Sequence, residues 1–472
     1  MCLRAAALAA PLLAIATPAV AADLRPDQQA FRALYKELVE TNTTVTNGSC
    51  TLAAERMAAR LKAAGLPDSQ VTLFATPEHP KDGGLVAVLP GRDPKAKAVL
   101  LLAHIDVVEA KRADWTRDPF TLIEENGYFY ARGTSDDKAM AAVWTDTMAR
   151  FAAARAKPRR TLKLALTCGE ETSGAFNGAD WLARNRRGLI DAEFALNEGG
   201  GGLTDGKGLV EGGKLVVQEL QVGEKAYVDY TLTATNPGGH SSQPVRDNAI
   251  VALANALARV HAHEFPLRFS DTTRAYFTKA GALRHDETGK AMIALAANPA
   301  DKAAEAIVNK DKMLHSLLRT TCVPTMIDGG HALNALPQRA TANVNCRIFP
   351  DQTAEQTQAA LVAAIADPAI TVELRIKDKP IATMPPLDPK VVGPIERLAA
   401  KYFPGVPVIP SMATGASDAV YTSAVGIPTY GVPGIWGNPD GDGIHGLNER
   451  IEVRSLMVGR DYLYDLVHAY VD

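Results

Sequence analysis

The chain has 472 residues, which is too long for one compact domain, so we expect two or three. Its formal net charge is -3 and 47% of its residues are hydrophobic, values typical of a globular protein. No domain-wide excess of Lys and Arg occurs, which argues against a nucleic-acid partner. The 37 glycines and 29 prolines are spread among turns and form no low-complexity tract, which argues against disorder.

Residues 1–22 have the pattern of a secretory signal peptide. A short positively charged start precedes the apolar stretch Ala5–Val20, and the small residues Ala19 and Ala21 occupy the positions that a signal peptidase reads. No later segment reaches the roughly 18 to 20 apolar residues of a membrane helix, so we expect no membrane span. The pattern predicts a secreted protein, with the periplasm as first choice. The alternative is an N-terminal helix of the mature fold.

Four of the five cysteines follow this segment. Cys322 and Cys346 lie on two strand-like runs that could pair as a hairpin. They are then either a disulfide or two buried free thiols. Cys168 falls in an apolar strand, where we expect it to serve packing.

Residues 23–219 alternate between helical and strand-like patterns. The run 98–106 is short and rich in Leu and Val, as in a buried strand, whereas 140–154 has amphipathic helical periodicity. Strand-like runs near 161–169 and 192–200 follow, with a helix between them. This rhythm predicts an α/β domain with helices on both faces of a mainly parallel, mixed sheet.

From about residue 220 the pattern changes. Residues 226–235 alternate like an antiparallel strand, and the order strand, helix, strand, strand, helix follows as far as 387. This order predicts an inserted α+β domain of the ferredoxin-like type, with a mostly helical insertion at about 265–319. Residues 388–472 return to the α/β pattern and are expected to complete the first domain.

Metal-binding residue types follow several of these strands, at the edge where open α/β sheets bind ligands. A lone His-x-Asp is usually a surface hydrogen bond, and an acidic pair is usually a solvated turn. Their succession at the strands of one domain is far more specific, because carboxylates beside buried strands are costly unless paired or metal-bound. The positions are His104, Asp106, Asp136, Asp137, Glu170, Glu171, Glu198 and His445.

The residue types suit zinc, which binds imidazole nitrogen and carboxylate oxygen and leaves one position for water at catalytic sites. In an extended backbone, a two-residue step puts Asp106 on the same side as His104, where it can accept the free ring N–H. An Asp in a tight Gly-rich loop suits a bridge between two metals. The Glu170-Glu171 pair supplies one ligand and one unligated base.

Seven motifs in this order resemble the M20 family of metallopeptidases. They are AHIDVV, Trp115-x-x-Asp118-Pro119-Phe120, ARGTSDDK, TCGEETSG, LNEGGG, GGHSSQP and GIHGLNE, spread over essentially the whole mature chain. RTTCVPTM, GGHALNALPQ and ANVNCRIFP are more similar to the carboxypeptidase S and N-acyl-amino-acid hydrolase branch. The resemblance implies a zinc-peptidase-like catalytic domain with a lid or dimerisation domain at 220–387. Ala139 departs from the usual glycine after Asp-Asp-Lys, a small change beside the site.

The resemblance also implies roles for the acidic residues. Two Zn²⁺ ions are expected, with Co²⁺ or Mn²⁺ as substitutes. Glu170 would be the general base and Asp106 the orienting carboxylate. Asp136 is preferred to Asp137 as the bridge, because many relatives retain only the first Asp. The implied metal ligands are His104, Asp136 and Glu198 at one ion and Asp136, Glu171 and His445 at the other.

A substrate carboxylate calls for Arg, whose planar fork binds it through two hydrogen bonds. Arg347 occupies the family position, Asn334 is a second contact, and backbone N–H groups around Gly415 are a third. His240 is the implied donor to the developing oxyanion, either within one chain or across a dimer. Without the resemblance, His240 would be taken as a loop histidine. For Arg347 the alternative is a charge on the surface of a strand.

The expected activity is therefore cleavage of an amide bond next to a free carboxylate, in a small peptide or an N-acyl amino acid. We expect a monomer or a homodimer. A single-metal hydrolase is one alternative, and a metal-free binding protein on the same scaffold is another. The presence of every ligand type and of Glu170 argues against the metal-free protein.

Overall fold

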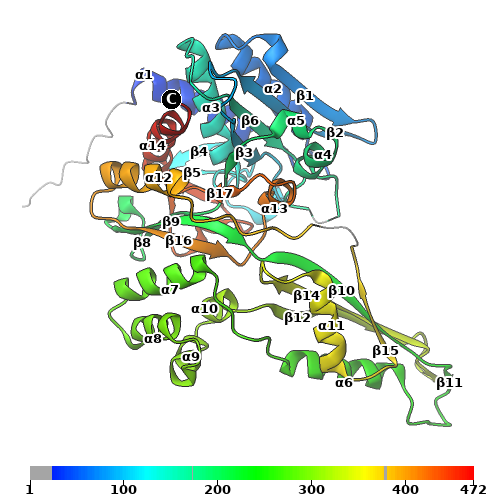
Figure 1. Cartoon of the computed structure of the whole chain (residues 1–472). Helices are drawn as coiled ribbons and strands as arrows, with labels where there is room; N and C mark the ends of the chain where they lie inside the picture. The colour runs from blue at the N-terminus through cyan, green and yellow to red at the C-terminus, as the bar shows by residue number, and fades with distance from the viewer. Residues whose placement is uncertain (1–23, 173, 377–379) are drawn as a thin grey trace, which may run out of the picture.

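The computed structural model describes residues 24–172, 174–376 and 380–472. The signal-peptide pattern of residues 1–22 lies outside this range. The described strands form two principal sheets, a larger one in the upper body of Figure 1 and a smaller one below it.

Ten of the described strands form the larger sheet. Its four central strands are mutually parallel, and antiparallel pairs flank them. The strand order is β1 (Val71–Thr76), β2 (His79–Leu89), β6 (Leu162–Thr167), β3 (Val99–His104), β7 (Phe194–Asn197), β17 (Thr429–Gly431), β9 (Leu215–Glu224), β8 (Gly201–Thr204) and β18 (Trp436–Gly437), with β16 (Val408–Ala413) also paired to β9.

Helices cover both faces of this sheet, because its central strands are apolar on both sides. In β3, Val99 and Leu101 pack into one core and Leu100 and Leu102 into the other. The first core is covered by α1 (Pro26–Val39), α2 (Cys50–Ala63), α3 (Lys138–Ala153), α12 (Pro389–Tyr402) and α14 (Val453–Val471), and the second by α4 (Gly178–Asn185), α5 (Arg187–Ile190) and α13 (Ala419–Ala424). The predicted α/β fold is confirmed.

The C-terminal part of the chain completes the larger sheet: β17 lies between β7 and β9, β18 pairs with β8, and β16 pairs with β9. A separate three-stranded sheet joins β4 (Ile123–Glu125) and β5 (Tyr128–Tyr130) to β19 (Arg450–Glu452). This pairing brings the loop before β19 beside the turn after β5. Both segments contain predicted metal ligands.

The smaller sheet is antiparallel, in the order β12 (Thr321–Gly329), β14 (Arg339–Ile348), β10 (Ala226–Thr235) and β15 (Ile370–Leu374). Helices α6 (Ala249–Ala262) and α11 (Ala354–Ile365) pack on it. This is the βαββαβ order of a ferredoxin-like unit, with β15 added to the five predicted elements. The predicted boundary at 219/220 falls within β9, and the smaller sheet begins at Ala226. A short pair, β11 (Gly239–His240) and β13 (Ala335–Leu336), lies at its far end (Figure 1).

The expected helical insertion consists of α7 (Asp271–Leu283), α8 (Glu287–Ala297), α9 (Lys302–Val308) and α10 (Lys312–Leu317). These helices share a core with Val217 of β9 and with Ile409 and Met412 of β16. The insertion therefore packs on the edge of the larger sheet, where Figure 1 shows it beneath β16.

The described part of the chain contains two disulfides, Cys50–Cys168 and Cys322–Cys346. Cys322 and Cys346 are direct partners on β12 and β14, so the bridge is the correct alternative for that pair. The prediction for Cys168 is wrong: it bonds to Cys50 at the start of α2, a residue more than a hundred positions away that no local pattern indicated. Among the described residues, no helix combines the length and apolarity needed to cross a bilayer.

Candidate metal centre and substrate cavity

The five predicted metal ligands meet at one edge of the larger sheet. His104 ends β3, and Glu198 directly follows β7. Glu171 lies in the turn after β6, which is the strand next to β3. Asp136 lies in the turn between β5 and α3, and His445 lies in the loop before β19. Parallel strands bring their carboxyl ends to the same edge, which explains how side chains so distant in sequence come together.

The carboxylate of Asp136 lies between the two histidines. His104 Nε2 is 3.1 Å from Asp136 Oδ1 and 3.5 Å from Glu198 Oε2. His445 Nε2 is 3.1 Å from Asp136 Oδ2 and 2.8 Å from Glu171 Oε2. Each oxygen of the Asp136 carboxylate thus faces a different histidine, and each histidine also faces a different glutamate. The two histidines therefore define two sets of donor atoms, and both sets include Asp136.

Asp137 belongs to the same cluster. Its side chain is buried, and one of its carboxylate oxygens lies within 4.8 Å of ligand atoms of His104 and Glu198. Its Oδ2 makes no hydrogen bond within the described part of the chain. Asp137 is therefore close enough to contribute to the set that contains His104.

The charges of the cluster fit divalent cations. Burial raises the pKa of Glu171 and of Asp137, and it raises the pKa of Glu170 to about 10. Burial lowers the pKa of His104, but the carboxylates of Glu198, Asp106 and Asp136 outweigh this and hold it well above its usual value. Carboxylates gathered around two histidines form an anionic, desolvated site of nitrogen and oxygen donors, which is the chemistry that zinc and similar ions require.

Asp106 joins two parts of the cluster. Its backbone oxygen is 3.1 Å from His104 Nδ1, and its carboxylate Oδ1 is 3.6 Å from the same nitrogen. Its other oxygen, Oδ2, accepts the backbone N–H of Glu171 at 3.1 Å. Asp106 therefore orients the ring of His104 largely through its main chain and also fixes the turn after β6.

Glu449 is a positioning residue that the sequence reasoning did not find. Its carboxylate accepts backbone N–H groups of Gly133, Ser135 and Asp136 at 3.0, 2.8 and 3.1 Å, and it pairs with Arg132. The side chain is 1% exposed. It therefore holds the turn that presents Asp136. Its position in GLNE, four residues after His445, was the available signal.

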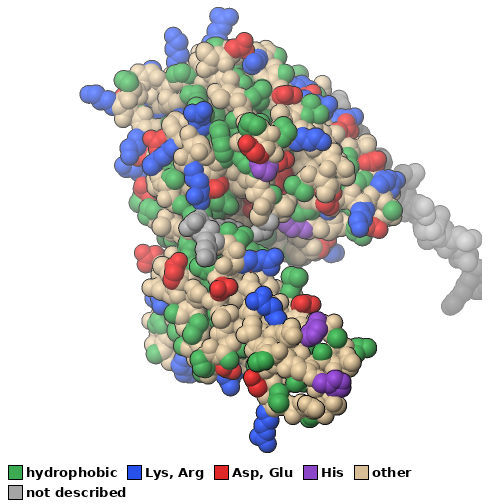
Figure 2. Space-filling view, turned by 90° about the vertical axis from the view of Figure 1, so that its right-hand side faces the viewer, with side chains coloured by type: hydrophobic (Ala, Val, Ile, Leu, Met, Phe, Trp, Pro, Cys, Tyr) green, Lys and Arg blue, Asp and Glu red, His purple; other side chains and the backbone are tan. Residues whose placement is uncertain are grey.

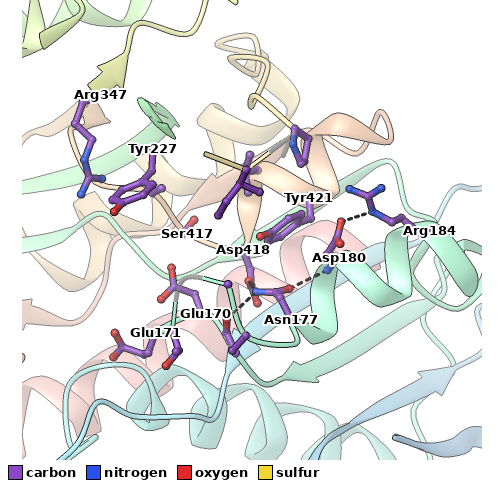
Figure 3. Close-up of a pocket in the computed structure, with 18 of the residues that line it drawn as sticks. Glu170, Glu171, Asn177, Asp180, Arg184, Tyr227, Arg347, Ser417, Asp418 and Tyr421 are labelled. Carbon is purple, nitrogen blue, oxygen red and sulfur yellow. Dashed lines mark hydrogen bonds and ion pairs between the residues drawn. The ribbon is translucent and has the colours of Figure 1, made fainter. Parts of the chain in front are cut away.

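A cavity of about 500 Å³ opens between the larger and smaller bodies beside this cluster. Glu170, Glu171 and His445 line it from the larger body, and Tyr227 and Arg347 line it from the smaller one. Figure 2 shows that the surface is hollowed between the two bodies, and Figure 3 shows Arg347 and Tyr227 across the cavity from the two glutamates.

Arg347 lies directly opposite Tyr227 on β14 and β10, with its guanidinium 4.6 Å from the centre of the tyrosine ring. No carboxylate in residues 24–172, 174–376 and 380–472 forms an ion pair with it. Its position in the cavity wall leaves the guanidinium available for an anion.

Asp418 also lines the cavity and was not predicted. It accepts hydrogen bonds from Thr167 Oγ1 and Asn177 Nδ2, both at 2.7 Å. Burial raises its pKa to about 6. Its bonds tie the loop after β16 to Thr167, which ends β6, and to Asn177, which precedes α4, and Glu170 lies in the chain between these two residues.

His240 and Asn334 lie far from this cavity. Both are exposed and belong to the β11–β13 end of the smaller body, where Ser241 N–H donates to Asn334 O at 3.0 Å. His240 Nδ1 accepts from Ser242 N–H at 3.1 Å. Neither residue lines the cavity in its own chain. Gly415 is exposed in the loop after β16, and its neighbours Ala416 and Ser417 line the cavity.

Comparisons with known proteins agree with this geometry. The model for peptidase family M20/M25/M40 matches residues 100–469. Mouse N-fatty-acyl-amino acid synthase/hydrolase PM20D1 is 26% identical over 385 residues, which cover 80% of this chain and 75% of the mouse protein. Probable carboxypeptidase S-like 2 of Dictyostelium discoideum is 26% identical over 385 residues, which cover 80% of this chain and 72% of that protein.

The fold is similar to a solved structure, the M20 family metallo-carboxypeptidase Sso-CP2 from Sulfolobus solfataricus. The TM-score is 0.70 at 18% sequence identity, and the similarity covers 95% of this chain and 99% of that chain.

Proposed function

The chain belongs to peptidase family M20/M25/M40 and is a metal-dependent peptidase or amidohydrolase, and from this premise we propose that it uses two zinc ions to cleave an amide bond beside a free carboxylate. The observation that supports two ions best is the carboxylate of Asp136, whose oxygens lie 3.1 Å from His104 Nε2 and 3.1 Å from His445 Nε2. In this proposal His104 and Glu198 complete one site, and Glu171 and His445 complete the other.

Two divalent cations held there would supply an acidified water molecule and polarise the scissile carbonyl. Glu170 lies in the cavity wall beside the ligand Glu171, in reach of a substrate at that position. The cations would lower the pKa of Glu170 from its high value and make it a carboxylate able to accept a proton. Glu170 then takes the proton of the attacking water and delivers it to the leaving nitrogen.

Arg347 binds the substrate carboxylate in this proposal. Its guanidinium has no ion-pair partner among the described residues, lies in the cavity wall, and offers a planar pair of N–H donors. Backbone N–H groups around Gly415, whose neighbours Ala416 and Ser417 line the wall, contribute to the binding of the same carboxylate. The substrates are therefore small peptides or N-acyl amino acids with a free C-terminal carboxylate.

His240 does not line the cavity of its own chain, and Figure 1 shows β11 at the far end of the smaller sheet. We assign it instead to the cavity of a second copy, to which the exposed β11–β13 end would reach. Asn334 lies at the same end and would enter with it. A homodimer is thus the proposed active form.

An exported protein is consistent with the disulfides Cys50–Cys168 and Cys322–Cys346, since such bonds persist in oxidising compartments. Secretion, with the periplasm as first choice, stays a proposal that rests on residues 1–22. N-terminal sequencing of the mature protein tests it, because a start at Met1 would contradict cleavage.

The proposed function is tested by changing the substrate, the metal and the general base in turn. Hydrolysis of N-acetyl-phenylalanine should require a divalent cation and should fail on the corresponding amide, which lacks the carboxylate. Glu170→Gln should lower kcat by about 10²- to 10⁴-fold while the bound metal per chain stays unchanged. Asp271→Asn, on the surface of α7, is the matched control. Full activity of Glu170→Gln would contradict the proposed mechanism.

A further inference from the structure

The face of the smaller sheet that α6 and α11 do not cover contains a row of polar side chains. Residues two apart in a strand point to the same face of a sheet. Alternate residues of β10 pack into the core beneath the helices, so Tyr227 and Asp229 lie on the opposite face. Their direct partners on β14 are Arg347 and Asn345. Tyr227 and Arg347 line the substrate cavity, whereas Asp229 and Asn345 lie just beyond it.

Asp229 is held by amide donors of β14. Its Oδ1 accepts from Asn343 Nδ2 and from Asn345 Nδ2, both at 2.9 Å. The hydroxyl of Tyr227 also donates a hydrogen bond to this carboxylate. Burial raises the pKa of Asp229, but hydrogen bonds to the charged form outweigh it and keep the pKa below its ordinary value. The carboxylate is therefore ionised at neutral pH, and no Lys or Arg among the described residues forms an ion pair with it.

Tyr227 connects this carboxylate to Arg347. The guanidinium of Arg347 lies 4.6 Å from the centre of the Tyr227 ring, and Figure 3 shows both side chains at the same wall of the cavity. The face of an aromatic ring attracts a cation without accepting a conventional hydrogen bond from it. The contact therefore leaves the N–H donors of the guanidinium for a ligand. A direct ion pair with a carboxylate of the protein would occupy those donors.

We propose that Asp229 is a positioning residue for recognition of the substrate carboxylate. It holds the hydroxyl of Tyr227, and the ring of Tyr227 holds the guanidinium of Arg347 at the cavity wall. The charge of Asp229 also acts against the burial that lowers the pKa of Arg347. This inference rests on the proposed function, in which Arg347 binds that carboxylate. It adds a residue that acts on the substrate only through two other side chains.

The physical reason is preorganisation. A long side chain loses rotamer freedom when it binds a ligand, and a side chain that is already held in place loses less. The benefit therefore appears in the binding of the carboxylate, which keeps its charge throughout the reaction. Disruption of the row should raise KM and change kcat much less.

Asp229→Asn tests this role, since it removes the charge but keeps the size and one acceptor oxygen. In the metal-loaded protein, KM for N-acetyl-phenylalanine should rise by about 3- to 10-fold, while kcat changes by less than about 2-fold. Asp328→Asn is the matched control, because Asp328 is exposed on β12 of the same sheet and does not line the cavity. An unchanged KM in Asp229→Asn would overturn the inference.

A double-mutant cycle separates the positioning of Arg347 from a general structural role. In the Arg347→Met background, Asp229→Asn should raise KM by less than about 2-fold, because the group that it positions is gone. An equal rise in both backgrounds would overturn the inference and leave the proposed function intact. If Arg347→Met alone leaves KM unchanged, the proposed carboxylate site is wrong, and the inference fails with it.

Tyr227→Phe tests the same connection if Asp229→Asn does not fold. It keeps the ring but removes the hydroxyl that bonds to Asp229. KM should rise by a factor similar to that expected for Asp229→Asn, while the bound metal per chain stays unchanged. A KM equal to that of the unsubstituted protein would show that this hydrogen bond plays no part in placing Arg347, and would overturn the inference.

Discussion

In the proposed function, recognition of the substrate carboxylate rests on Arg347. Burial lowers the pKa of its guanidinium, which nevertheless stays charged because arginine begins from so high a value. Replacement by methionine keeps much of the length of the side chain but removes the charge and both donors. Arg347→Met should raise KM for N-acyl amino acids by about 10- to 100-fold with a smaller change in kcat.

Steady-state kinetics on a free acid and on its methyl ester checks this prediction. The ester lacks the charge that Arg347 binds, so its KM should hardly respond to the substitution. Arg375→Met, on the same smaller body but outside the cavity, is the control. Equal increases in KM for acid and ester would contradict the role of Arg347.

Glu224 gives a pH dependence of stability. The side chain is 2% exposed between the two sheets, and it accepts a hydrogen bond from Ser417 Oγ at 2.7 Å. Burial raises its pKa from 4.5 to about 8. Between these values the folded protein holds a proton that the unfolded chain has lost, so the free energy of unfolding falls as pH rises through this window.

Glu224→Gln mimics the protonated form and should remove the fall in the free energy of unfolding as pH rises. The Tm of the variant relative to the unsubstituted protein should therefore increase from pH 5 to pH 8, as measured by calorimetry. Glu373→Gln, at an exposed position of β15, should show no such trend. A difference in Tm that stays constant across the window would show that Glu224 is ionised in the folded protein.

At the scale of residues, the ligand cluster could be predicted because each ligand lies in a recognisable local sequence pattern. His104 ends a buried strand, Glu171 and Glu198 follow two others, and the sheet brings such positions together. Glu224 and Glu449 could not be found in this way. Their roles depend on hydrogen bonds to segments distant in sequence, Ser417 and the turn 133–136, that no local pattern identifies.

At the scale of elements, the disulfide between Cys50 and Cys168 ties the start of α2 to the turn after β6. It closes a chain segment of 118 residues, against 24 for Cys322–Cys346. Loop-closure entropy therefore predicts a larger stabilisation, about 4 to 5 kcal/mol against about 3. Cys50→Ala with Cys168→Ala should lower the free energy of unfolding more than Cys322→Ala with Cys346→Ala.

Urea unfolding monitored by circular dichroism measures both losses. Cys168 is also two residues before Glu170, so the first pair of substitutions should lower kcat as well. A larger loss of stability on replacing Cys322 and Cys346 than on replacing Cys50 and Cys168 would contradict this prediction. The Cys50–Cys168 pairing escaped prediction because it depends on tertiary packing, whereas Cys322 and Cys346 face each other in one hairpin.

The element pattern alone predicted the two sheets but not every contact between them. The alternation of strands and helices sufficed for the larger sheet, and the βαββα order sufficed for the smaller one. The chain near 370–374 is short and gave no separate strand signal, yet it completes the smaller sheet as β15. The helices at 271–317 were expected, but their packing on β9 and β16 follows only from the three-dimensional core that they share.

At the scale of the whole molecule, the exposed end that contains His240 is separated from the cavity of its own chain. If a second copy receives it, a mixture of two inactive variants should recover activity. Glu170→Gln retains His240, and His240→Ala retains Glu170, so a mixed dimer has one complete site. Equal amounts, allowed to exchange subunits, should give about a quarter of the unsubstituted activity.

Activity that appears only after subunit exchange would support the dimer. Each variant measured alone is the control. A mixture no more active than its components would contradict action across two chains. Whether His240 acts within or between chains was left open by the sequence, because the position of a loop relative to a distant cavity depends on how the two bodies are arranged.

The central claim is that Asp136 bridges two metal ions. Anomalous X-ray diffraction at the zinc edge, from crystals of the zinc-loaded protein, tests it most directly. The account predicts two peaks about 3.5 to 4 Å apart, one beside His104 and Glu198 and the other beside Glu171 and His445, with Asp136 between them. A single peak, or peaks away from the Asp136 carboxylate, would contradict it.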